Sequence, residues 1–227
     1  MEKNKVFFRD YLQKEKNYSL HTVTAYCNDL LEFETFNKMN FEQENIDEVN
    51  YSQIRSWIVE LVDAGVSNSS VNRKISSLRA YYKFLLKTRQ IELNPLLKHK
   101  ALKSPKKIQI PFSEKELTDV LDCIVYPPGY EGLRDRLVID LFYSTGIRRA
   151  ELIQLKVCDV DLSNNTLKVL GKRSKERILP ILPIISKQIK SYFRERTNLE
   201  VIADPEFFFL TQKGVKLNDS FVYRLIN

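Results

Sequence analysis

The spacing of apolar residues along this chain predicts a protein that is helical over most of its length. In the first hundred residues, apolar side chains recur with helical spacing in four segments, residues 6–12, 23–33, 54–62 and 71–86. Ser19 lies where it can cap the second helix, Gly65 follows the last apolar residue of the third, and Pro95 closes the fourth. Residues 1–97 are therefore expected to form an all-helical domain of four helices.

Helices are also expected to dominate the second half of the chain. Ser113 and Glu116 have the spacing of a capping box ahead of an apolar run, which predicts a helix start. A buried helix is expected to end at Gly146, because glycine just beyond an apolar stripe is the usual helix stop. Two further amphipathic segments, over residues 184–193 and from Asn218 onward, predict helices by the same periodicity.

A small β-hairpin is expected between these helices. Residues 166–170 and 177–181 are short runs rich in β-formers, and the polar turn between them contains Gly171. The predicted fold class is therefore mainly α, in two domains. The second domain covers residues 112–227 and combines helices with a small antiparallel β-sheet.

Residues 98–111 are predicted to be a basic linker between the two domains. This stretch contains two prolines and five lysines, has no acidic residue, and lacks apolar periodicity. Lys103, Lys106 and Lys107 could cross a DNA backbone between two gripping domains, or they could simply keep a tether solvated. Both interpretations fit the sequence.

Composition narrows the class of protein. The chain has 36 Lys and Arg against 29 Asp and Glu, a net charge of +7, which is compatible with a polyanionic partner. A hydrophobic content of 43% indicates a folded protein. The three cysteines are scattered, which argues against a disulfide scaffold or a zinc site. No signal sequence or membrane-length apolar run is visible, so the expected location is the cytoplasm.

The fourth predicted helix carries polar residues of unusual charge. Arg73, Lys74, Ser77 and Lys83 are interleaved with its apolar stripe, and no acidic residue occurs between residues 67 and 90. Solvated helix faces usually mix both signs, so a face of one sign could lie against DNA phosphates. An ordinary solvated Lys/Arg face is the alternative, and the residues alone do not decide between the two.

The strongest chemical signal lies between residues 141 and 177. Arg148 and Glu151 are three residues apart at a predicted helix start, so both lie on one face and the carboxylate can steady the guanidinium. The hairpin turn that follows carries the clustered cations Lys172, Arg173 and Lys175. A fixed guanidinium and a mobile ammonium brought together suit a reacting phosphodiester.

These residues resemble a known family. The segment Thr145-Gly146-Ile147-Arg148-Arg149-Ala150-Glu151-Leu152 is similar to the T-G-x-R-x-x-E-L segment of tyrosine recombinases, the phage-integrase and Xer group. The hairpin Gly171-Lys172-Arg173-Ser174-Lys175-Glu176-Arg177 resembles the G-K-G-x-K-E-R hairpin that follows at a similar interval there. The resemblance implies a core-binding domain over residues 1–97 and the first part of a catalytic domain over residues 112–227.

The resemblance also implies roles for individual residues. Arg148 would hold the oxygens of the reacting phosphate, Lys172 would protonate the 5′ leaving oxygen, and Glu151 would orient Arg148. The motif Ser19-x-x-Thr22-x-x-x-Tyr26 is similar to one near the start of the family's second helix. His21 and Thr22 would then contact phosphate at a helix N-terminus. Lone histidines are more often structural, so that alternative stays open for His21.

The implied reaction is DNA strand exchange through a 3′-phosphotyrosine, with no metal or cofactor. The implied partners are double-stranded DNA and further recombinase protomers, four in the intact family. The family's later H-x-x-R helix and tyrosine nucleophile have no counterpart here, since the only histidines are His21 and His99. We therefore expect a truncated chain that binds DNA and does not cleave it. A non-catalytic DNA-binding regulator or a degenerate remnant is the alternative, and a type IB topoisomerase fits the motif spacing less well.

Overall fold

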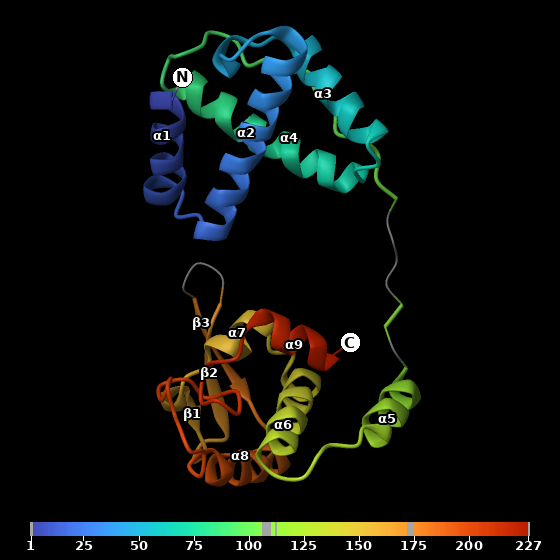
Figure 1. The fold of residues 1–227 in the computed structure, drawn as a ribbon, viewed down its shortest axis with the longest axis vertical. Helices are drawn as coiled ribbons and strands as arrows, with labels where there is room; N and C mark the ends of the chain where they lie inside the picture. Colours follow the sequence, from blue (N-terminus) through green and yellow to red (C-terminus); the bar gives the residue numbers. More distant parts are fainter. Residues whose placement is uncertain (1, 106–109, 112, 172–174, 227) are drawn as a thin grey trace. The chain divides into compact units, whose positions relative to one another are not determined.

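The computed structural model describes residues 2–105, 110–111, 113–171 and 175–226, and divides the chain into two compact units, Met1–Gln109 and Ile110–Asn227 (Figure 1). Each unit has its own hydrophobic core. Within the described ranges the structure is mainly helical with one small antiparallel sheet, which confirms the predicted fold class. No helix in these ranges is both long enough and apolar enough to cross a membrane.

Among its described residues, unit 1 contains four α-helices joined by short turns. They are α1 (Glu2–Asp10), which continues into a π-helical turn (Tyr11–Glu15), α2 (Leu20–Phe41), α3 (Tyr51–Asp63), which follows a 3₁₀ turn (Ile46–Glu48), and α4 (Asn68–Lys87). Ser19 caps α2 as predicted, since its hydroxyl accepts from the backbone N–H of Thr22. The longest two helices, α2 and α4, pack against each other, and Phe33 of α2 and Tyr82 of α4 are both buried in the core of unit 1.

The beginning of the predicted linker is attached to unit 1. The side-chain amide of Asn72 accepts from the backbone N–H of Leu102 and donates to its carbonyl, both at 2.9 Å. Asn68 donates to the carbonyl of Lys103 at 2.8 Å, and the Leu102 side chain packs against the core. Two side-chain amides of α4 thus fix the path of the chain as far as Lys103.

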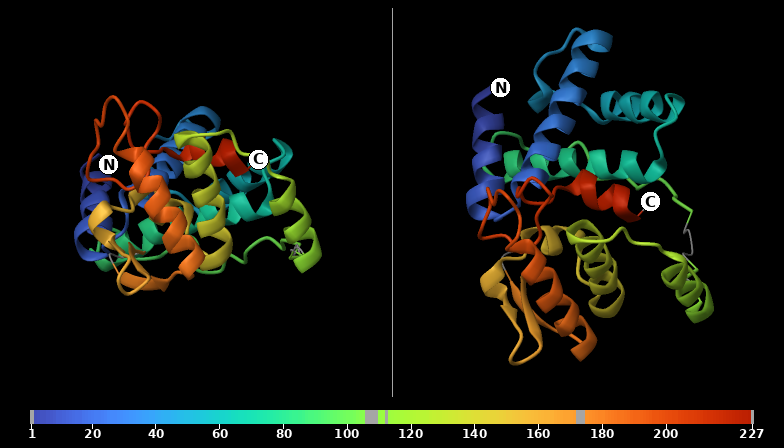
Figure 2. Two further views of the ribbon diagram at one scale, coloured as in Figure 1. Left: turned by 90° about the horizontal axis from the view of Figure 1, so that it is seen from below. Right: turned by 60° about the horizontal axis from the view of Figure 1, so that its bottom comes forward.

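Unit 2 combines a three-stranded sheet with five α-helices among its described residues. The helices are α5 (Glu114–Cys123), α6 (Tyr130–Thr145), α7 (Arg149–Gln154), α8 (Pro183–Arg196) and α9 (Asp219–Ile226), and a 3₁₀ turn (Val157–Asp159) follows α7. The strands are β1 (Val160–Asp161), β2 (Thr166–Leu170) and β3 (Glu176–Pro180), in the order β1-β2-β3. Helices α6 and α8 lie side by side, whereas α7 packs against β2 and α9 (Figures 1 and 2).

Local signals explain where these elements begin and end. The predicted capping box is present, because Ser113 accepts from the N–H of Glu116 while the Glu116 carboxylate accepts from the N–H of Ser113. Gly146 ends α6 with a φ of 60°, a left-handed conformation that glycine adopts without strain. The chain therefore turns sharply at this residue, directly before the predicted Arg148 site.

Candidate active site and nucleic-acid interface

The turn between α6 and α7 places Arg148 at the start of a helix. The backbone N–H of Gly146 donates to the carbonyl of Phe142, and the hydroxyl of Thr145 accepts from the N–H of Ile147. Arg148 then caps α7 with an extended backbone, φ −76° and ψ 147°. Its side chain is 69% exposed, so the guanidinium faces solvent while its backbone is fixed.

Glu151 is the buried carboxylate at the centre of this site, with a side chain only 3% exposed. One oxygen accepts from Nη1 of Arg148 at 2.8 Å, which is the ion pair predicted from their spacing. The other accepts from the backbone N–H of Arg148 at 2.9 Å and from Nη2 of Arg177 at 2.7 Å. Burial alone would raise the pKa of Glu151, but the hydrogen bonds from Arg177 and Arg148 outweigh it and lower the pKa to about 2. The carboxylate is therefore charged at neutral pH.

Arg177 was not singled out by sequence reasoning. It lies on β3, opposite Val169 in the hairpin register, 26 residues from Glu151 in the chain. The Nε atom of Arg177 is buried without a hydrogen-bond partner in the described parts of the structure. The only available signal was its place at the end of the hairpin motif, since a contact over this separation has no local pattern.

The end of strand β2 also lies close to this carboxylate. Strands β2 and β3 pair as far as Leu170 and Glu176, and the N–H of Gly171 donates to the carbonyl of Lys175 at 2.7 Å. A Cβ atom added to Gly171 would lie 3.5 Å from a carboxylate oxygen of Glu151, so the base of the loop lies against the Arg148 anchor. Lys172 and Arg173 follow directly in the sequence and lie outside the described residues.

The neighbouring arginine has a different partner. Nε of Arg149 lies 2.9 Å from a carboxylate oxygen of Asp219 in α9. Arg148 and Arg149 are adjacent in sequence and both are exposed. Of these two arginines, only Arg148 is bonded to Glu151 among the described contacts. The structure therefore distinguishes the two arginines by the carboxylate that each one contacts.

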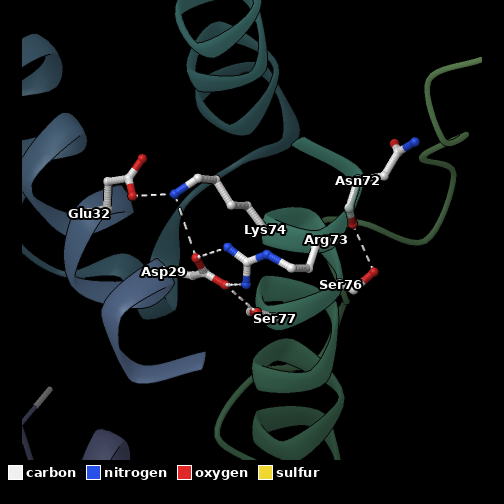
Figure 3. Close-up of polar contacts among 7 residues, drawn as sticks. All are labelled: Asp29, Glu32, Asn72, Arg73, Lys74, Ser76 and Ser77. Atoms are coloured by element: carbon white, nitrogen blue, oxygen red, sulfur yellow. Dashed lines mark hydrogen bonds and ion pairs between the residues drawn. The ribbon is translucent and has the colours of Figure 1, made fainter. Parts of the chain in front are cut away.

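In unit 1 the basic face of α4 meets acidic residues of α2 (Figure 3). Asp29 is almost fully buried and accepts from both Nη atoms of Arg73, at 2.7 and 2.9 Å. Lys74 lies 3.6 Å from Asp29 and forms a second ion pair with Glu32. Helix α4 itself contains no acidic residue, but the neighbouring helix α2 supplies Asp29 and Glu32. This part of the face therefore does not carry a single sign of charge.

One predicted DNA contact is wrong. Ser77 has no exposed surface, and its hydroxyl donates to Asp29 at 2.6 Å. It faces the α2–α4 interface, because the apolar stripe and the Asp29 contact both lie on that side of the helix. Ser77 is therefore a structural partner of Asp29 and cannot reach a phosphate on the surface.

The remaining predicted contacts are distributed over both units. His21, Lys83, Lys103 and Lys175 are exposed, and Thr22 is half-buried with its hydroxyl bonded to Ser19. Within the described ranges, Lys83 takes part in no ion pair. Lys106 and Lys107 lie outside the described residues. No cluster of three or more His, Cys, Asp or Glu side chains in the described structure could hold a metal ion.

Comparison with known proteins identifies two family domains. Residues 7–89 match the phage integrase N-terminal SAM-like domain, and residues 111–227 match the phage integrase family model. Tyrosine recombinase XerC of Staphylococcus haemolyticus (strain JCSC1435) is 32% identical over 232 residues, which cover 100% of this chain and 75% of that protein. The resemblance inferred from the two motifs is thus confirmed.

Solved structures share the fold at lower identity. The XerH site-specific recombinase bound to a palindromic difH substrate has a TM-score of 0.71 at 21% identity, over 98% of this chain and 65% of that one. A lambda integrase tetramer bound to a Holliday junction has a TM-score of 0.69 at 15% identity, over 98% of this chain and 63% of that one. These likenesses show a shared fold, and the two domain matches with the XerC relative show that the chain belongs to the phage integrase family of tyrosine recombinases.

Proposed function

We propose that this chain is the DNA-binding and Arg–Lys part of a site-specific tyrosine recombinase of the Xer type, acting on double-stranded DNA. The observation that supports the proposal most strongly is the buried carboxylate of Glu151. It ties Arg148 to Arg177 and lies against Gly171, the residue that precedes Lys172. A guanidinium at a helix start and the base of a lysine-bearing loop are therefore fixed to one anionic group.

The proposed chemistry follows from the donors that this arrangement leaves free. Arg148 uses one of its five N–H donors on Glu151, so the others can bind the non-bridging oxygens of a phosphate. These oxygens gain negative charge when a tyrosine oxygen attacks phosphorus and the bond from phosphorus to the 5′ oxygen breaks. Lys172 would pass a proton to that departing oxygen. Glu151 would hold Arg148 in place and would not contact the phosphate.

Non-specific DNA affinity is assigned to exposed cations in both units. His21, Thr22, Lys83, Lys103 and Lys175, with Lys106, Lys107 and Arg173 from outside the described residues, are the proposed phosphate contacts. Such contacts position a protein on the duplex without reading its sequence. On DNA the chain would assemble with further recombinase protomers, a proposal supported by the tetrameric lambda integrase that shares its fold.

A polypeptide of these 227 residues is proposed to bind DNA without cleaving it. It has no histidine after His99 and no H-x-x-R segment, and the family's chemistry draws on both. On a nicked suicide duplex we expect no covalent protein–DNA adduct, with S. haemolyticus XerC on its own site as the positive control. An adduct trapped on any tyrosine of this polypeptide would contradict this part of the proposal.

Binding itself can be tested by fluorescence anisotropy with a labelled mixed-sequence duplex over a range of salt concentrations. Affinity should fall steeply with salt, by a slope of about 0.9 per phosphate contact. Arg148→Ala should reduce both the affinity and the slope. Arg149→Ala is the matched control, because its guanidinium has the carboxylate of Asp219 as its partner, whereas Arg148 shares the single carboxylate of Glu151 with Arg177. A salt-independent affinity, or equal effects of the two variants, would argue against the proposed phosphate site.

A further inference from the structure

The ion cluster between α2 and α4 is organised around one buried carboxylate. Asp29 accepts from Nη1 and Nη2 of Arg73, so it grips the end of the guanidinium with two parallel hydrogen bonds (Figure 3). The hydroxyl of Ser77 supplies a third hydrogen bond to the same carboxylate. A side chain held in this way has lost its rotamer freedom before any ligand arrives.

The charges in this cluster compensate one another. Arg73 and Lys74 contribute two positive charges, and Asp29 and Glu32 contribute two negative charges within ion-pair distance. A neutral cluster exerts little long-range attraction on a polyanion. Lys83, on the same helix, is exposed and takes part in no ion pair among the described residues. Phosphate attraction is therefore better assigned to Lys83 than to Arg73.

Although its charge is compensated, Arg73 keeps free N–H donors that are held in a fixed orientation. A guanidinium has five N–H donors, and Asp29 uses the two on its end-on edge. The side-on edge, formed by the Nε–H and one further Nη–H, has no partner in the described structure, and the Arg73 side chain is 50% exposed. Two parallel N–H donors match the O6 and N7 acceptors that guanine presents in the major groove. This unpartnered edge therefore has the donor geometry needed to read a guanine.

We propose that Arg73 recognises a guanine in the major groove of the bound DNA, and that Asp29 is the residue that positions it. This inference rests on the proposed DNA binding and assigns sequence selection within it to one side chain. Asp29 compensates the positive charge that would attract Arg73 to any phosphate. It also holds the guanidinium in one orientation, so that the two donors of its free edge can pair with one base. Specificity and non-specific affinity then reside in different residues of the same helix.

The test is selection of bound duplexes from a library with a randomised region, followed by sequencing, for the 227-residue chain and its variants. The wild type should enrich a G·C pair at one position. Arg73→Lys keeps the charge and removes the fork, so discrimination at that position should fall by about 5- to 150-fold. Asp29→Asn should lose the same preference and steepen the salt slope by about 0.9, because a freed Arg73 can then bind phosphate.

Lys83→Ala is the matched control on the same helix. It should weaken binding to all sequences, reduce the salt slope by about 0.9, and leave the selected motif unchanged. Emission of the buried Trp57 reports whether each variant keeps the fold of unit 1. If Asp29→Asn does not fold, Arg73→Lys decides the question.

Three results would overturn the inference. They are a wild-type chain that binds without base preference, an Arg73→Lys variant that selects the wild-type motif, and an Arg73→Ala variant that weakens all sequences equally. A wild-type chain that fails to bind any duplex would instead refute the proposed function, and this inference with it.

Discussion

Replacing Glu151 by glutamine tests the buried carboxylate on which the candidate active site depends. The substitution keeps the size of the side chain and removes the charge that Arg148 and Arg177 share. Two guanidinium groups then lose their anionic partner, one of them in a partly buried position. Removing one partner of a buried ion pair is usually far more costly than removing one partner of an exposed pair.

The magnitude follows from the pKa of the Glu151 carboxyl group. The folded protein lowers this pKa from its ordinary 4.5 to about 2. Each pKa unit corresponds to about 1.4 kcal/mol, so the charged form stabilises unit 2 by about 3 kcal/mol at pH 7. Because the folded pKa is the lower one, this stabilisation is present above pH 4.5 and is lost as the pH falls toward 2. The wild type and Glu151→Gln should therefore become more alike in acid.

Denaturant unfolding of the full chain, followed by circular dichroism between pH 7 and pH 3.5, measures this difference. Trp57 is the single tryptophan and is buried in unit 1, so its fluorescence gives an internal reference that should not shift. Glu176→Gln is the matched control, since Glu176 is 63% exposed and pairs with Lys168 on the same sheet. That exposed pair should contribute less than about 1 kcal/mol.

Two results would refute the reasoning about Glu151. The first is a Glu151→Gln variant no less stable at pH 7 than the Glu176→Gln control, which would mean that the buried ion pairs add no net stability. The second is a loss of stability that stays constant from pH 7 to pH 3.5. A constant loss would indicate a packing defect, because the contribution of the charge must shrink below pH 4.5, where the Glu151 carboxyl of the unfolded chain becomes protonated while the folded one stays charged.

Two further substitutions test how local backbone features hold each unit together. Gly132→Ala should destabilise unit 2 by about 1–3 kcal/mol in thermal unfolding, because the new Cβ would overlap the backbone carbonyl of Pro127. Gly132 lies within α6, where alanine is otherwise the better helix former, so a stabilised variant would contradict this packing. Asn72→Ala removes both hydrogen bonds to Leu102, so limited trypsin digestion should cut faster at Lys103 than in the wild type; an unchanged rate would show that these bonds do not hold the segment.

The sequence was sufficient to predict a structural feature wherever the interacting residues lie within one helical turn of each other. Ser19 and Ser113 were identifiable as caps because each bonds an N–H three residues ahead. Gly146 was identifiable as a helix stop because its left-handed backbone favours glycine. The Arg148–Glu151 pair was predictable for the same reason, since three residues bring both side chains to one face.

The sequence was insufficient to predict a contact when the two residues belong to different helices or strands. Arg177 reaches Glu151 across 26 residues, and Arg73 reaches Asp29 across 44. No periodicity relates such positions, because their separation is set by how the helices and strands pack. Ser77 shows the resulting error most clearly: on α4 alone it belongs to a polar face, and only the packing of α2 reveals that this face is buried.

The same physical device occurs in both units, and it changes how a basic surface should be interpreted. Glu151 and Asp29 are each nearly buried, and each accepts at least three hydrogen bonds from groups that include an arginine. A buried carboxylate is stable only with such partners. Each acidic residue therefore orients its arginine, and each arginine in turn stabilises the buried charge of its acidic partner. A paired arginine contributes directed donors while its charge is largely compensated. The lysines and arginines of α4 should therefore contribute fewer phosphate contacts to the salt dependence of DNA binding than their number suggests, and Arg73 should be among those that contribute none.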